Sequence, residues 1–182
     1  PATHLRRQGV PFWDYLDAAA VPSTFYDLPS NYPPSPSRHG NHRCLSGMGV
    51  PDMLGTYGTY QHYADDNPPQ AVEEGGGKRF RLTFERETAK ARIVGPEHAL
   101  LKEPAPVSIE FLVHRDRQAG AAVIEIQGRR ILLKAGGWSP WIKLDFEYPM
   151  PAMVPDRHVG GICRFYLQEA APDFRLYVTP VN

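Results

Sequence analysis

The 182-residue sequence has few cysteines, no excess of either charge and no long hydrophobic run. Its two cysteines, Cys44 and Cys163, are too few for a disulfide framework or a four-cysteine zinc site, so we expect free thiols. Twenty Lys and Arg balance twenty Asp and Glu, which argues against binding to a nucleic-acid backbone or an anionic membrane. No apolar segment approaches the roughly 18 residues of a membrane-spanning helix.

The first residues, PATHLRRQGVPFW, lack the apolar core of a secretion signal, and the localisation stays open. The composition itself, with 42% hydrophobic and 11% aromatic residues, is that of a soluble globular protein.

Residues 75–182 alternate apolar and polar side chains, the period-two pattern of half-buried strands. The clearest examples are Phe80-Leu82-Phe84, Ile109-Phe111-Val113, Ile142-Leu144-Phe146, Cys163-Phe165-Leu167 and Phe174-Leu176-Val178. About eight such segments are separated by Gly, Pro and Asp, with no helical period between them. This pattern predicts a mainly β fold, an antiparallel β-sandwich over 75–182.

Residues 1–74 are different. Pro11 followed by Phe12 and Leu16 predicts a helix of about ten residues. Residues 21–27 then read as a strand of an α/β domain. Such a strand normally pairs with parallel neighbours, and we expect that no other segment of this chain is one. A long Gly- and Pro-rich loop fills 28–77. We therefore expect 1–74 to be a partial segment of an α/β hydrolase domain, into which 75–182 is inserted.

Several blocks resemble one known family. They are PFWDYLDAAAVP from Pro11, YPP from Tyr32, LSGMGVPDMLGTYGTYQHYADD from Leu45, WSPWIKLDF from Trp138, and GICRFYL through LYVTPVN from Gly161. Together they resemble the type I phosphodiesterase and nucleotide pyrophosphatase-like branch of the alkaline phosphatase superfamily. The resemblance spans nearly the whole chain.

The resemblance implies an internal fragment of a metal-dependent phosphodiesterase or phosphatase. It implies a Thr or Ser nucleophile and zinc or another divalent pair, held by Asp and His residues, in the parent enzyme. The matching blocks lie between the parts that carry those groups, so we expect no catalytic residue, metal ligand or cofactor in this chain. Its expected partners are the remainder of the catalytic domain and, in the parent, a small phosphate-ester substrate. The isolated chain is expected to be inactive, with the sandwich framing the site or selecting the substrate.

Three residues of the most family-like block are candidate substrate contacts: Ser46, Asp52 and Thr56. The hydroxyls could donate to a phosphate oxygen, whereas Asp52, after Pro51, also fits a turn or cap. The run His39, His42 and Cys44 could in principle hold a soft metal ion, but we expect a solvent-exposed loop there.

Trp138 and Trp141 flank Ser139-Pro140 in the expected sandwich. Paired exposed tryptophans can stack on sugar rings, so a carbohydrate-binding module is an alternative function, and a protein-interaction module is another. The structural alternative is that one Trp closes the core while the other covers an edge, and this is the interpretation that we favour from the sequence.

Overall fold

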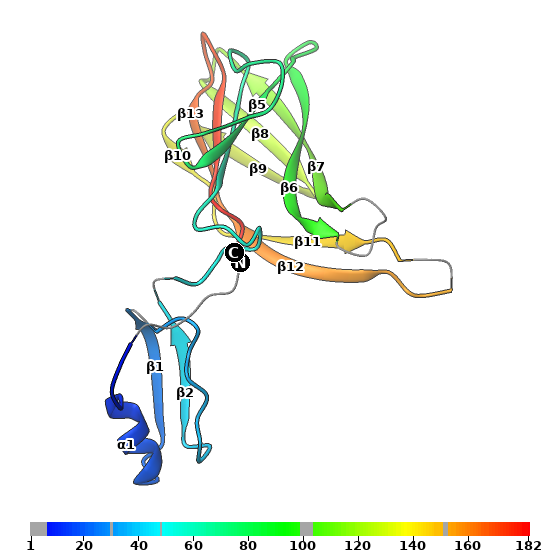
Figure 1. Ribbon diagram of the computed structural model, residues 1–182. Helices are drawn as coiled ribbons and strands as arrows, with labels where there is room; N and C mark the ends of the chain where they lie inside the picture. Colours follow the sequence, from blue (N-terminus) through cyan, green and yellow to red (C-terminus); the bar gives the residue numbers. More distant parts are fainter. Residues whose placement is uncertain (1–6, 30, 48, 99–103, 151–152) are drawn as a thin grey trace. The chain divides into compact units, whose positions relative to one another are not determined.

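The computed structural model describes residues 7–29, 31–47, 49–98, 104–150 and 153–182. The chain divides into two compact units, residues 1–51 and 52–182 (Figure 1). The boundary expected at 74/75 falls inside the second unit, because strand β3 (Tyr60–Ala64) pairs with β14 (Arg175–Val178) from the far end of the sequence.

The first unit consists of helix α1 (Phe12–Ala18) and strands β1 (Ser23–Leu28) and β2 (His42–Ser46). The helix has 7 residues, fewer than expected, because Ala20 adopts a left-handed φ of 56° and turns the chain toward β1. The expectation that the strand has no parallel neighbour was wrong, since β1 pairs with β2 in parallel. The crossover that a parallel pair needs is the loop between β1 and β2.

The second unit contains twelve strands among the described residues. They are β3, β4 (Val72–Glu74), β5 (Gly77–Arg81), β6 (Thr88–His98), β7 (Ala105–Asp116), β8 (Ala121–Ile126), β9 (Arg129–Lys134), β10 (Gly137–Trp138), β11 (Ile142–Tyr148), β12 (Arg157–Cys163), β13 (Phe165–Glu169) and β14.

These strands form a six-stranded sheet in the order β10-β13-β14-β3-β5-β4, a four-stranded antiparallel sheet β6-β7-β8-β9, and the antiparallel ribbon β11-β12 (Figure 1). The β3–β5 pair is parallel, and the other pairs of the six-stranded sheet are antiparallel. The mainly β prediction is therefore confirmed. The strand number exceeds the expected eight partly because β3 and β4 lie in the segment predicted to be irregular.

The two larger sheets pack face to face around one hydrophobic core. The ring of Phe111 on β7 lies edge-on to Tyr63 of β3 at 5.2 Å between centroids, and it contacts Phe165 of β13 at 5.6 Å. All three rings are almost fully buried. The apolar side chains of the alternating segments therefore lie on the side of each sheet that faces this core.

The chain changes sheets at Arg164. We predicted one strand through Cys163, Phe165 and Leu167, but β12 ends at Cys163 and pairs with β11, whereas β13 begins at Phe165 and pairs with β10 and β14. Period-two burial continues through the corner, so the sequence pattern does not reveal it. Both cysteines are free thiols, as expected, and burial raises the pKa of Cys163 to about 12.

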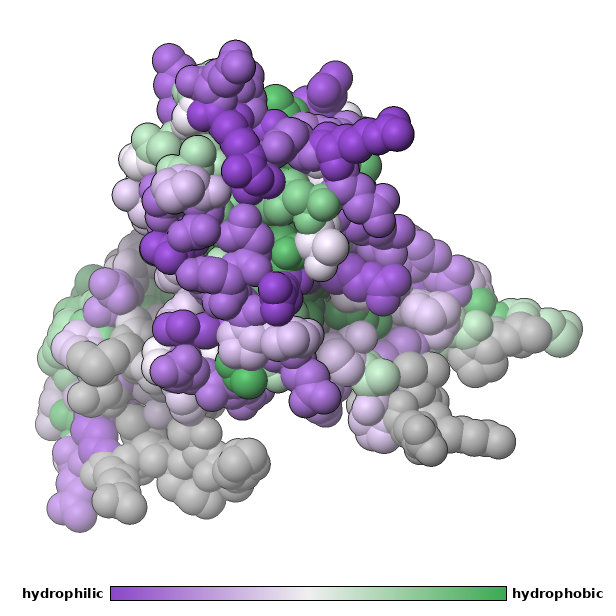
Figure 2. Space-filling model, turned by 90° about the horizontal axis from the view of Figure 1, so that it is seen from above, coloured by the Kyte–Doolittle hydropathy of each residue, from purple (hydrophilic) through white to green (hydrophobic). Residues whose placement is uncertain are grey.

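The face of the molecule shown in Figure 2 is mostly hydrophilic, with hydrophobic residues in smaller patches. Such a mixture is normal for a surface in contact with water. Within the described ranges, no helix is long and apolar enough to cross a membrane.

Candidate functional site

Aromatic side chains follow one another across four strands of the six-stranded sheet. Trp138 on β10 lies opposite Tyr166 on β13, which lies opposite Tyr177 on β14. The Trp138 ring stacks on Tyr166 at 4.7 Å and 29°, and Tyr177 packs against Tyr60 of β3 at 5.2 Å. Directly opposed side chains on neighbouring strands point to the same face, and Tyr60 lies two residues before His62, the residue opposite Tyr177, so these aromatic residues form a row on one face.

Arg164 lies beside the end of this row, between two tryptophans. Its guanidinium carbon is 5.0 Å from the ring centroid of Trp138 and 5.7 Å from that of Trp141. Arg164 Nε donates to the Ser139 carbonyl at 2.8 Å, and no described carboxylate lies within 4.0 Å of the guanidinium. We call Trp138, Trp141 and Arg164 the Trp–Arg cluster.

Hydrogen bonds through Ser139 hold this cluster in place. Ser139 is 1% exposed, its N–H donates to the Phe165 carbonyl, and its hydroxyl oxygen accepts from the Phe165 N–H at 2.9 Å. The segment between the two tryptophans is thus fixed to the corner where the chain changes sheets. A surface held this way loses little conformational entropy when it binds a ligand.

The favoured interpretation of the tryptophans was wrong. Trp138 is 46% exposed and Trp141 is 58% exposed, so neither closes the core. The core at this end is filled instead by Phe165 and Leu167, which are 0% exposed. The sequence could not separate these alternatives because Trp138 lies on a two-residue strand with no alternation to assign its face.

Asp52 organises the loop that precedes β3. Its carboxylate accepts hydrogen bonds from the N–H groups of four residues and from one hydroxyl, at 2.7–3.0 Å; the donors are Leu54 N, Thr56 N, Thr56 Oγ1, Gly58 N and Thr59 N. Burial raises the pKa of this carboxyl, but the hydrogen bonds from Thr56, Thr59 and Gly58 outweigh it and hold the pKa below 3.8. Asp52 therefore has the turn role that the sequence allowed.

Thr56 lies in the same loop and lines a cleft of about 500 Å³. Its hydroxyl is 2.7 Å from both Asp52 Oδ2 and the Thr59 hydroxyl. The ionisable residues around the cleft are Glu73, Glu74, Glu97 and Lys78. Three carboxylates against one ammonium give this cleft a negative potential, which disfavours a phosphate anion.

Ser46, the third candidate, belongs to the first unit. It ends β2, is 7% exposed, and its hydroxyl donates to the Asn31 carbonyl. Asp52 and Thr56 are thus brought together, whereas Ser46 serves another network. In all three residues the polar atoms have partners inside their own unit.

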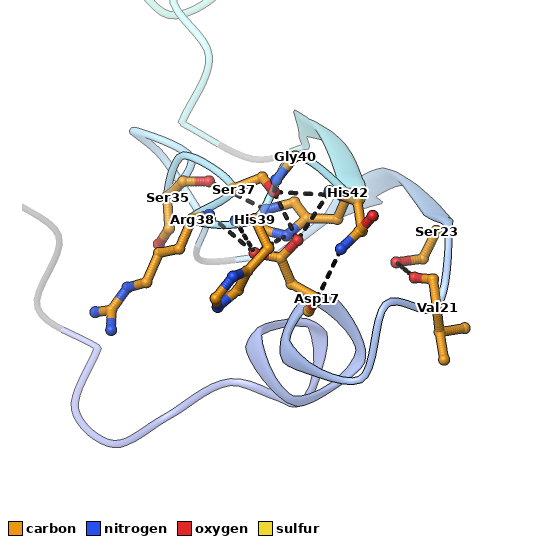
Figure 3. A network of polar contacts seen from close by, with 10 residues as sticks. Asp17, Val21, Ser23, Ser35, Ser37, Arg38, His39, Gly40 and His42 are labelled. Atoms are coloured by element: carbon orange, nitrogen blue, oxygen red, sulfur yellow. Dashed lines mark hydrogen bonds and ion pairs between the residues drawn. The ribbon is translucent and has the colours of Figure 1, made fainter.

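A second buried carboxylate, Asp17, organises the first unit. The loop after β1 folds over the end of α1 and directs donors to this carboxylate (Figure 3). They are Ser37 Oγ, Arg38 N, His39 N and Asn41 N, at 2.7–3.0 Å. Burial raises the pKa of Asp17, but the hydrogen bonds from Ser37 and the backbone outweigh it and hold the pKa well below its usual range. Sequence reasoning missed this network, because the donors lie 20 to 24 residues after Asp17 in the sequence.

The run His39, His42 and Cys44 is not arranged around a common point. His42 is buried, with Nδ1 3.9 Å from Asp17, while His39 is exposed and Cys44 accepts from Asn31 Nδ2 at 2.9 Å. The expectation of a solvent-exposed loop was wrong for His42, which begins β2. In the described part of the chain, no group of three or more His, Cys, Asp and Glu could hold a metal ion.

The described residues therefore offer no set of side chains for a divalent pair, which the family resemblance places elsewhere in the parent enzyme, and no chemical step is assigned to it here. No protein-family model, no curated protein and no solved structure matches the chain.

Proposed function

We propose that this chain is an internal segment of a metal-dependent phosphoester hydrolase, similar to the type I phosphodiesterase and nucleotide pyrophosphatase-like enzymes. The first unit belongs to the α/β catalytic domain. The second unit, residues 52–182, which we call the β-rich unit, frames the active site or selects the substrate. The sequence blocks from Pro11 to Asn182 support this proposal by resemblance.

The structural observation that carries the proposal is the parallel pair β1–β2 with α1 beside it. Trp13 of α1 packs against Phe25 of β1 at 5.8 Å, which gives the strand–helix contact of a parallel α/β sheet. Parallel sheets are normally covered on both faces. Yet large apolar side chains of this unit stay exposed, among them Phe12 at 55%, Tyr26 at 72% and Leu45 at 59%.

These exposed side chains fit a sheet that continues in further strands and helices of the same domain. The nucleophile and the divalent pair belong to that remainder, and so does the chemistry of phosphoryl transfer. The Ser46 hydroxyl bonds within the first unit, to Asn31, whereas Asp52 and Thr56 stabilise the loop that precedes β3.

The experiment compares the complete protein encoded by the reading frame with the isolated 182-residue chain. Bis(p-nitrophenyl) phosphate and p-nitrophenyl phosphate are the substrates, with and without added Zn²⁺. We expect metal-dependent hydrolysis by the complete protein and none by the isolated chain. Inactivity of the zinc-loaded complete protein on both esters contradicts the proposed reaction class. Zinc-stimulated hydrolysis by the isolated chain contradicts the placement of the catalytic groups.

The selecting role has its own test in the complete protein. Replacing the β-rich unit by a short Gly-Ser linker is expected to change KM or the preference between the two esters while the bound zinc stays the same. Zinc content by atomic absorption is the control. Unchanged kinetics on every ester would rule the selecting role out.

A further inference from the structure

We propose that the Trp–Arg cluster binds an acidic carbohydrate, a pyranose that carries a carboxylate or sulfate group. This inference is independent of the proposed hydrolase function, because it concerns the outer face of the β-rich unit and needs no catalytic group. It rests on three observations: exposed indole rings, a cation with no acidic partner among the described residues, and a rigid support.

The indole rings supply the stacking surface. Trp141 is 58% exposed, and Trp138 is 46% exposed although Tyr166 stacks on it. A tryptophan ring presents a broad apolar face with little conformational freedom, which suits the C–H face of a pyranose ring. Tyr166 and Tyr177 continue the row on the next two strands, and neighbouring strands lie about 4.8 Å apart. The rings of this row contact one another, Trp138 with Tyr166 at 4.7 Å and with Tyr177 at 6.0 Å, so the face left open for a sugar ring is that of Trp141.

Arg164 supplies the charge recognition. Its Nε is used by the Ser139 carbonyl, so the guanidinium is anchored while its terminal nitrogens remain available. A guanidinium binds a carboxylate or sulfate through two parallel hydrogen bonds. Placed between two indoles, it would meet an acidic group on a stacked sugar ring. A neutral sugar would give the terminal nitrogens of Arg164 no anionic acceptor.

The charge of the chain as a whole favours a sugar over a polynucleotide. Twenty basic residues balance twenty acidic ones, so no general attraction for a dense polyanion exists. Elsewhere on the same sheet Arg79 pairs with Glu74 at 3.4 Å and Arg175 pairs with Asp66 at 2.8 Å, whereas Arg81 lies on β5, away from the indole rings. The cluster thus supplies one cation, which suits one acidic group beside the stacked sugar ring.

The test uses the full 182-residue chain and α-1,4-linked oligogalacturonides of four or five units, with neutral cello-oligosaccharides of the same length for comparison. Isothermal titration calorimetry measures Kd, and tryptophan fluorescence follows the indoles. We expect the acidic ligand to bind at least about tenfold more tightly than the neutral one. This advantage is expected to shrink as NaCl is raised.

Three variants assign the binding to the cluster. Trp141→Ala is expected to weaken oligogalacturonide binding about tenfold or more, because it removes an exposed stacking face without opening the core. Arg164→Gln is expected to abolish the preference for the acidic ligand. Tyr57→Ala is the matched control: it removes another exposed aromatic ring of the same unit, 70% exposed, and should leave Kd within about twofold.

Four outcomes overturn the proposal: no binding of oligogalacturonide, equal affinity for neutral and acidic ligands, equal losses in Trp141→Ala and Tyr57→Ala, or binding of uridine monophosphate in place of the sugar. Thermal unfolding checks that each variant is folded. The Arg164→Gln variant loses the hydrogen bond to Ser139 and is left out if it does not fold. The proposal is then tested by the affinity of Trp141→Ala and by the salt dependence of binding to the wild-type chain. Inactivity of the complete protein toward phosphoesters leaves this binding prediction unaffected.

Discussion

Replacing Arg115 by alanine is expected to lower the free energy of unfolding of the β-rich unit by about 3 kcal/mol. The Arg115 side chain is 3% exposed, and its guanidinium contacts Asp65 at 3.1 Å and Glu87 at 2.5 Å. It also lies 3.9 Å from the centroid of the Phe84 ring. The variant loses these contacts together with the packing of the buried stem.

The two carboxylates are more exposed than the arginine, at 26% and 46%, so water can solvate them after the substitution. This keeps the expected loss at the lower end of the range for a broken buried ion pair, about 3–5 kcal/mol. Urea unfolding followed by circular dichroism measures it.

Arg117→Ala is the matched control for this prediction. Arg117 pairs with the same Glu87 at 3.0 Å, but its side chain is 50% exposed. Exposed ion pairs contribute little to stability, so we expect the free energy of unfolding to change by no more than about 0.5 kcal/mol. Similar losses in the two variants would contradict the role assigned to burial.

Replacing Asp52 by asparagine is expected to destabilise the β-rich unit by about 3 kcal/mol at neutral pH. Asp52 is 7% exposed, and both of its oxygens accept hydrogen bonds, two on Oδ1 and three on Oδ2. An asparagine side chain has only one acceptor oxygen, and its amide group would point donors at donors. Thermal unfolding of the wild-type chain and the variant measures the loss.

The pH dependence gives this prediction a specific signature. The folded-state pKa of Asp52 is lowered from 3.8, so its contribution to stability is complete above pH 3.8 and declines as the pH falls toward the folded-state pKa. The difference between wild type and Asp52→Asn should therefore shrink below pH 3.8. A difference that stays constant down to pH 2.5 would contradict the assignment.

Asp116→Asn serves as the control for Asp52. Asp116 is exposed and accepts one loop hydrogen bond, from Ala119 N at 2.9 Å. Because Asp116 is a single exposed acceptor, we expect its replacement to lower the free energy of unfolding by less than about 1 kcal/mol.

Strands with an apolar inner face were predictable from the sequence. In β11, and in β7 as far as Val113, the inward positions are Ile, Phe, Val and Leu, and the observed burial alternates as the sequence does. The hydrophobic effect acts on each of these side chains locally, so a periodic pattern is enough to reveal the strand.

Strands with polar inner positions were not predictable. Gln61 of β3 is 0% exposed, and its side-chain amide donates to the Val94 carbonyl at 2.9 Å and accepts from the Val94 N–H at 2.8 Å. In β2, His42 and Ser46 are buried. A buried polar group is tolerated only when a partner satisfies it, and here the partners are distant in the sequence.

The sequence by itself determined that this protein is mainly β, which segments alternate, and that Asp52 suits a turn. Only the tertiary structure decided which sheet each strand joins, that β1 has a parallel partner, and that the Trp–Arg cluster lies open on the surface. The physical reason is the range of the interactions. Periodic burial and turn geometry are set by near neighbours, whereas strand pairing, satisfaction of buried polar groups and exposure of a large ring depend on residues that folding brings together.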